Sequence, residues 1–168
     1  MMTIANAFIY SAPVHSGKTT ALMHWVENRN DVGGFLAPDI EGLRYLFTLS
    51  DRQFHPFQVE EGASSQNTVN ICRYRFLAEA FALAHRMLLE DARRSMPWLV
   101  VDEVGKLELQ GRGHEPALSQ VIQMSRQGEY TGRLLLVVRS ELLSDVVEKY
   151  ALHGAQVLHT PQELEVLS

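Results

Sequence analysis

The chain of 168 residues, 46% hydrophobic and 21% charged, is long and apolar enough to bury a core, and we expect one domain over residues 1–168. Its formal net charge of −5 excludes a generally basic nucleic-acid-binding surface but leaves room for a local positive pocket. The single cysteine, Cys72, excludes an intrachain disulfide and a cysteine-based zinc cluster. Because the sequence has no membrane-spanning apolar run and no secretory pattern, we expect a cytoplasmic protein without membrane contact.

A strand, a short loop and a helix are predicted in succession near the N-terminus. Residues 3–10 form an apolar run that predicts a buried strand, and apolar side chains recur at helical spacing over residues 19–27. Between them the sequence reads Ser-Ala-Pro-Val-His-Ser-Gly-Lys-Thr-Thr, residues 11–20. The pattern Ala-x-x-x-x-Gly-Lys-Thr in this context predicts a phosphate-binding P-loop.

In a P-loop, successive backbone N–H groups and the start of the helix point at one concave spot that favours polyanions. We expect Lys18 to reach the β- and γ-phosphates of a nucleoside triphosphate, and the Thr19 hydroxyl to ligate Mg²⁺. The residues expected around the phosphates are Ala12, Pro13, Val14, His15, Ser16, Gly17, Lys18, Thr19 and Thr20.

Three short strand candidates follow the first helix. They cover residues 33–38, 43–49 and 54–59, with tight turns expected over 39–42 and 50–52. This arrangement predicts an antiparallel meander inserted beside the phosphate loop.

The rest of the chain alternates between helical and strand-like segments, after a polar stretch over residues 60–70 that we expect to be a mobile loop. Strands alternating with helices predict an α/β fold in which a mostly parallel sheet is covered on both faces, in three layers. The predicted elements are a helix over 75–93, a strand over 98–101, a helix over 115–127, a strand over 133–138, a helix over 141–150, a strand over 156–159 and a short helix starting at 160–163.

An acidic pair ends the predicted strand at residues 98–101. Asp102 is expected at the carboxyl edge of the sheet, where it would hold Mg²⁺ through water. Glu103 would orient or deprotonate the water that attacks the γ-phosphate. The alternative is a strand that simply ends in solvated acids.

Several basic residues are candidates for offsetting charge in the transition state. The glycine at position 105 would let the chain turn so that Lys106 swings toward the phosphates, although a solvated loop lysine is the alternative. Four arginines are further candidates for an arginine finger or a base contact, against the alternative of ordinary surface residues. They are Arg44, Arg73, Arg75 and Arg139.

The motifs together resemble the small P-loop nucleoside-triphosphatases of the thermophile/cancer-related NTPase type. The resemblance rests on Gly-Lys-Thr-Thr at 17–20, Gly34-Phe35, Arg44, Phe76 and, above all, Asp-Glu-Val-Gly-Lys-Leu-Glu-Leu at 102–109. It extends over roughly residues 4–159. It implies a RecA-like core and slow, Mg²⁺-dependent hydrolysis of ATP, GTP or other nucleoside triphosphates to the diphosphate and phosphate.

Two residues of the loop depart from that family. Ala12 stands where the first P-loop glycine is usual, and His15 where the family typically has glycine. A histidine resists positive φ more than glycine does, so the loop is expected to be strained or the imidazole to contact the phosphates.

Three functions compete at this point. The first is a nucleoside-triphosphatase. The second is a phosphotransferase, which needs an acceptor pocket and an arginine-bearing lid, for which residues 60–75 are the candidate segment. The third is a nucleotide-binding module with little hydrolysis, in which bound nucleotide sets the affinity for a protein partner. No guanine-reading Asn/Thr-Lys-x-Asp motif is present, so strict GTP specificity is not expected.

Overall fold

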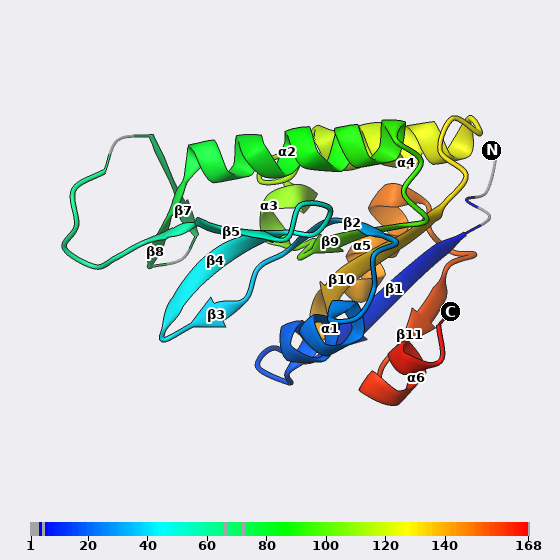
Figure 1. The fold of residues 1–168 in the computed structure, drawn as a ribbon, viewed down its shortest axis with the longest axis horizontal. Helices are drawn as coiled ribbons and strands as arrows, with labels where there is room; N and C mark the ends of the chain where they lie inside the picture. The colour runs from blue at the N-terminus through cyan, green and yellow to red at the C-terminus, as the bar shows by residue number, and fades with distance from the viewer. Residues whose placement is uncertain (1–3, 5, 66, 72, 168) are drawn as a thin grey trace.

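The computed structural model describes residues 4, 6–65, 67–71 and 73–167 (Figure 1). Cys72 and two residues of the strand predicted over 3–10, Thr3 and Ala5, lie outside the described residues. The elements in chain order are β1 (Ala7–Ala12), α1 (Lys18–Val26), β2 (Val32–Leu36), β3 (Asp39–Ile40), β4 (Leu43–Thr48), β5 (Gln53–Pro56), β6 (Gln58–Val59), β7 (Thr68–Ile71), β8 (Tyr74–Leu77), α2 (Ala78–Arg93), β9 (Trp98–Asp102), α3 (Lys106–Leu109), α4 (Ala117–Arg126), β10 (Arg133–Arg139), a 3₁₀ turn (Ser140–Leu142), α5 (Leu143–Tyr150), β11 (Gln156–Leu158) and α6 (Pro161–Glu165).

The main sheet has the strand order β11-β1-β10-β9-β2-β4-β3, with β5 paired to β4. The pairings among β11, β1, β10, β9 and β2 are all parallel. The predicted mostly parallel α/β sheet is therefore confirmed. Because parallel strands end at one edge, the residues after β1 and after β9 meet there, with only β10 between the two strands.

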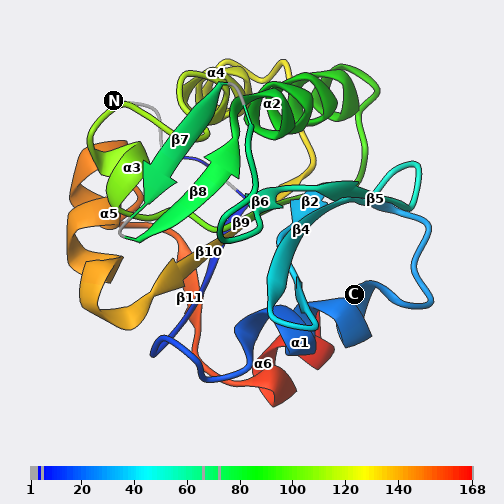
Figure 2. The same cartoon turned by 90° about the vertical axis from the view of Figure 1, so that its left-hand side faces the viewer.

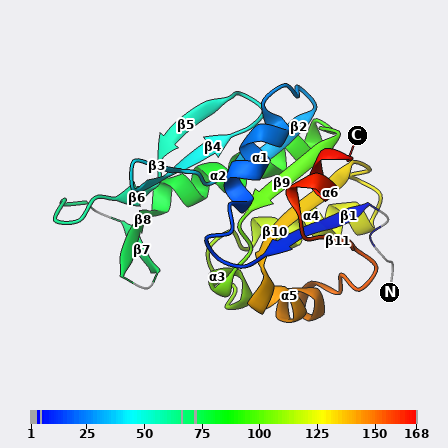
Figure 3. The same ribbon diagram turned by 90° about the horizontal axis from the view of Figure 1, so that it is seen from below.

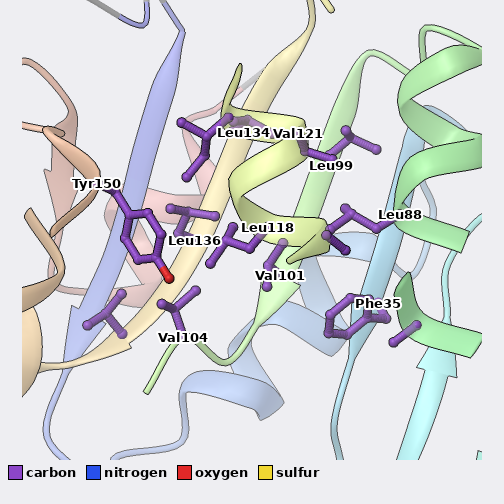
Figure 4. Packing of buried hydrophobic residues seen from close by; sticks show 14 of the residues in the cluster. Phe35, Leu88, Leu99, Val101, Val104, Leu118, Val121, Leu134, Leu136 and Tyr150 are labelled. Carbon is purple, nitrogen blue, oxygen red and sulfur yellow. The ribbon is translucent and has the colours of Figure 1, made fainter. Parts of the chain in front are cut away.

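One face of the sheet packs against α2, α4 and α5, and α2 and α4 run side by side along the top of Figure 1. Leu99 and Val101 of β9 point to this face and are fully buried. Figure 4 shows Leu118 and Val121 of α4 beside them. The alternation of β9 explains the layer, since every second residue of a strand reaches the same face.

The opposite face packs against α1 and α6, as Figure 3 shows from below. Trp98 and Val100 of β9 belong to this second cluster, and the ring of Trp98 meets the edge of Trp25 from α1 at a centroid distance of 5.1 Å. Thr160 caps α6 by accepting a hydrogen bond from the Glu163 N–H, which confirms the predicted last helix. Helices on both faces make the three layers that the sequence predicts.

The antiparallel part confirms the predicted meander but differs from it in detail. The strand predicted over 54–59 is split, because β5 pairs with β4 whereas β6 pairs with β8 in a separate small sheet of order β6-β8-β7. The turn predicted over 39–42 contains β3, which pairs with β4. The loop predicted over 60–70 runs into β7, and the helix predicted over 75–93 begins only at Ala78 because the preceding residues form β8.

Two glycines allow β2 to lie close to β9 and α2. Gly34 has φ +84°, and a Cβ at this position would lie 2.1 Å from the carbonyl oxygen of Val100. A Cβ on Gly33 would lie 2.7 Å from Oδ2 of the fully buried Asp91 in α2. The same oxygen accepts the Gly34 N–H at 2.9 Å, while burial raises the pKa of Asp91.

Among the described helices, none is long and apolar enough to span a bilayer.

Candidate nucleotide site

The predicted P-loop connects the end of β1 to the start of α1. Ala12 ends the strand, Gly17 precedes the helix with φ +84°, and His15 adopts φ +59°. The histidine thus takes the left-handed conformation that glycine would take more easily, in agreement with the expectation for this position. Residues 13–17 are exposed, and the first N–H groups of α1 have no partner within the helix.

Lys18 lies folded back over the loop. Its side chain is buried, and Nζ donates hydrogen bonds to the carbonyl oxygens of Ala12 at 3.1 Å and Pro13 at 3.0 Å. No acidic residue lies in the first turn of α1 to oppose an anion. The lysine charge is therefore held beside the open N-terminus of the helix, where an anionic ligand gains from both.

The loop and the acidic strand end meet directly. Thr19 Oγ1 donates to Oδ2 of Asp102 at 3.0 Å, and the same oxygen accepts the backbone N–H of Ala37 at 3.0 Å. Asp102 is only 2% exposed, and burial raises the pKa of its carboxyl, opposed by these hydrogen bonds and by the charge of Arg44. Residues 83 positions apart in the chain thus share one contact.

Glu103 follows Asp102 and remains partly exposed, with 27% of its side chain open to solvent. Its Oε1 accepts a hydrogen bond from Nε of Arg139 at 3.3 Å, at the end of the neighbouring strand β10. Nη1 of this arginine also lies 3.9 Å from Oε1 of Glu141. Arg139 therefore holds Glu103 beside the buried carboxyl of Asp102.

A cavity of about 540 Å³ opens over these groups. Its floor is the loop and the start of α1 from Val14 to Thr20, with Asp102 and Glu103 at one side. Arg44 of β4 and Arg139 of β10 are among the other lining residues. The volume falls within the range of about 300–1,000 Å³ typical of small-molecule sites.

The donor set beside the cavity suits Mg²⁺. A hydroxyl oxygen from Thr19 and a carboxylate oxygen from Asp102 are hard ligands, which this ion prefers together with water and phosphate oxygens. In the described part of the chain, no three His, Cys, Asp or Glu side chains form a cluster that could bind a metal without such additional ligands. The site therefore fits a cation that arrives with a polyphosphate.

Other predicted basic residues lie elsewhere. Lys106 is exposed at the start of α3 and borders a neighbouring pocket instead of the phosphate cavity, so its assigned role in catalysis stays a prediction. Arg73 stacks against Tyr74, and Arg75 donates to the carbonyl oxygen of Ala63. Neither arginine lines the cavity, whereas Arg44 and Arg139 do.

Glu108 and His114 were not predicted as site residues, and Arg139 was predicted only as one of four arginine candidates. Arg139 directly follows a buried strand, so a strand-end argument could have ranked it above the other arginines. Glu108 accepts the N–H groups of Gly105 at 2.7 Å and His114 at 2.8 Å, and burial raises its pKa to about 7. His114 is buried, which lowers its pKa to about 3, and no motif indicates it.

A phosphate loop and a strand-end carboxylate at one edge of a mostly parallel sheet define the P-loop NTPase class. The sequence matches a family profile described as NTPase over residues 7–160, and the chain belongs to this family. The membership confirms the resemblance inferred from the motifs and supports nucleotide binding as the general function.

The structure is also similar to the crystal structure of THEP1 from the hyperthermophile Aquifex aeolicus, with a TM-score of 0.69. The two chains share 17% identity, and the alignment covers 96% of this chain and 94% of the other. At this identity the likeness shows the fold, which is that of a P-loop NTPase. A comparison with the sequences of curated proteins gives no match.

Proposed function

We propose that the protein is a Mg²⁺-dependent nucleoside-triphosphatase that hydrolyses ATP, GTP or related triphosphates to the diphosphate and phosphate. The single observation that carries the proposal is the 3.0 Å contact between Thr19 and Asp102, with Glu103 beside it in the same cavity. A phosphate loop by itself supports binding, whereas the adjacent acids supply what hydrolysis needs.

The loop binds and orients the triphosphate. Residues Val14 to Thr20 line the cavity, and the N-terminus of α1 at this loop stabilises the phosphate charge. Nζ of Lys18 exchanges the carbonyl oxygens of Ala12 and Pro13 for β- and γ-phosphate oxygens. The lysine charge thus stays beside the N-terminus of α1 while its hydrogen-bond partners change.

Thr19 and Asp102 are the residues that would hold Mg²⁺. The bound ion would supply charge stabilisation to the β- and γ-phosphate oxygens. A cation at this position would favour the ionised form of Asp102 and so counteract the rise in pKa that burial causes.

Glu103 is positioned to act on the attacking water. Its carboxylate lines the cavity next to Asp102, and the hydrogen bond from Arg139 fixes its orientation. The water gives its proton to Glu103 as its oxygen bonds to the γ-phosphorus, and the bond from this phosphorus to the β–γ bridging oxygen breaks to release the diphosphate. Arg44 and Arg139 add positive charge at the wall where negative charge develops.

The test is phosphate release from a panel of nucleoside triphosphates, with and without Mg²⁺, by the wild type and the Glu103→Gln variant. We expect turnover that requires Mg²⁺ and that falls by about 10²–10⁴-fold in the variant, while nucleotide affinity is retained. Glu141→Gln is the matched control, because Glu141 also contacts Arg139 but does not line the cavity. Normal hydrolysis by Glu103→Gln would show that the water is activated by another group.

A further inference from the structure

A second pocket of about 390 Å³ adjoins the phosphate cavity and has no role in the function proposed above. Arg44, Glu103 and Arg139 line both cavities. A molecule seated in the second pocket would therefore reach the same carboxylate that we assign to water activation. The volume is sufficient for a small ligand.

Aromatic side chains make one side of this pocket. Phe57 meets both Phe76 and Phe81 edge-on, with centroid distances of 4.9 Å in each case. Ile71 of β7 and Tyr74 of β8 extend this surface from the small sheet, which projects beside α2 and α3 in Figure 2. Such a wall favours a flat ring, which buries a large area and meets aromatic edges and faces favourably.

Polar groups among the lining residues add hydrogen-bonding capacity to this pocket. His114 lines the pocket and is 3% exposed, and its Nδ1 has no hydrogen-bond partner among the residues described. A buried polar atom left in this state is the kind that a ligand group or a water satisfies. Glu108 and Gln58 provide further polar atoms at the same lining. A purely apolar ligand would leave Nδ1 of His114 unmatched, whereas a heteroaromatic ring offers its own donors and acceptors.

We propose that the second pocket binds a nucleoside, whose hydroxyl accepts the γ-phosphoryl group of the triphosphate held by the P-loop. The hydroxyl oxygen bonds to the γ-phosphorus, the bond from this phosphorus to the β–γ bridging oxygen breaks, and the hydroxyl proton passes to Glu103. The products are a nucleoside diphosphate and a nucleoside monophosphate. This inference rests on the proposed function, because it uses the same triphosphate site and the same carboxylate.

The structure explains how one site serves both reactions. Glu103 is partly exposed and lines the second pocket, so water can reach its carboxylate when no nucleoside is bound. A nucleoside in the pocket displaces this water and brings a hydroxyl to the same base, so transfer replaces hydrolysis. Water remains the acceptor when the pocket is empty, so we expect hydrolysis to continue in the absence of a second substrate.

The experiment uses the full chain, Mg²⁺ and a γ-phosphate-labelled triphosphate, with adenosine, guanosine, cytidine or thymidine added at about 1 mM, a level suited to a weak small-molecule ligand. Chromatography separates labelled nucleoside monophosphate from labelled inorganic phosphate. The variant Tyr74→Ala removes an aromatic side chain from the lining of the second pocket. Because the Tyr74 side chain is 42% exposed, its removal leaves the core intact. Tyr45→Ala is the matched control, because Tyr45 lines neither cavity.

We expect label in a nucleoside monophosphate, and a fall of about tenfold in this transfer in Tyr74→Ala, the size of a lost aromatic contact. Phosphate release without nucleoside should be the same in both variants and the wild type. Label found in inorganic phosphate alone, with all four nucleosides, would overturn the inference and leave the proposed hydrolysis standing. If the protein neither transfers the label nor releases phosphate, and binds no triphosphate, the inference and the proposed hydrolysis are both overturned.

Discussion

The buried carboxyl of Glu108 predicts how the stability of the protein depends on pH. Burial raises its pKa from the ordinary value of 4.5 to about 7, although the hydrogen bonds that it accepts from two backbone N–H groups act in the opposite direction. Between these two values the folded protein holds a proton that the unfolded chain releases. The free energy of unfolding therefore falls as pH rises through this window.

The magnitude follows from the two pKa values. A pKa difference of about 2.5 between the folded and unfolded states corresponds to about 3 kcal/mol, and about 2 kcal/mol of it develops between pH 5 and pH 8. Glu108→Gln removes this titration. The free energy of unfolding of the variant minus that of the wild type should therefore rise by about 2 kcal/mol from pH 5 to pH 8. The lost hydrogen bond adds a contribution that does not depend on pH and so does not change this rise.

His114 acts in the opposite direction at lower pH. Its pKa is lowered to about 3, so the unfolded chain binds a proton below about pH 6.5 that the folded protein does not accept, and stability falls as the pH is lowered. This contribution is present in the wild type and in Glu108→Gln, so it cancels in their difference.

The assay is urea unfolding of the nucleotide-free protein at pH 5, 6, 7 and 8, followed by the fluorescence of Trp25 and Trp98, which are both buried. Glu129→Gln, at an exposed position, controls for the loss of one negative charge. A change of less than about 1 kcal/mol between pH 5 and pH 8, or one of opposite sign, would refute the assignment of a neutral buried carboxyl at Glu108.

Three further predictions concern the loop, the metal and the sheet. Lys18→Ala should weaken triphosphate binding by more than about a hundredfold in calorimetry, since it removes the charge beside the phosphates, and unchanged affinity would contradict the assigned role. Chelation of Mg²⁺ by EDTA should stop phosphate release and be reversed by added Mg²⁺; turnover that persists in EDTA would exclude the metal role given to Thr19 and Asp102. Gly34→Ala should lower the free energy of unfolding by about 3 kcal/mol or more, because it combines positive φ with a clash against Val100. Gly128→Ala, with φ +76° and nothing within 4 Å, should lower it by only about 1 kcal/mol, and equal losses in urea unfolding would refute the clash.

Local patterns sufficed for the elements that carry the phosphate site. Three features could be predicted because each depends only on residues that are close together in the chain. They are the apolar run before the loop, the Gly-Lys-Thr at 17–19 and the acids that follow the strand at 98–101. The parallel α/β class follows from the same alternation of segments. The small sheet was not predicted. Residues 68–71 and 74–77 do contain β-branched and aromatic residues that favour strands, but their pairing with each other and with β6 shows only in the tertiary structure.

The sequence by itself determined where the P-loop lies and which acids end a strand, because these depend on backbone geometry over a few residues. Only the tertiary structure decided that β10 lies between β1 and β9, which brings Arg139 to Glu103. It also decided that Glu108 and His114 are buried beside an aromatic pocket. Burial and charge pairing arise from elements distant in the chain, and no local pattern records how those elements pack.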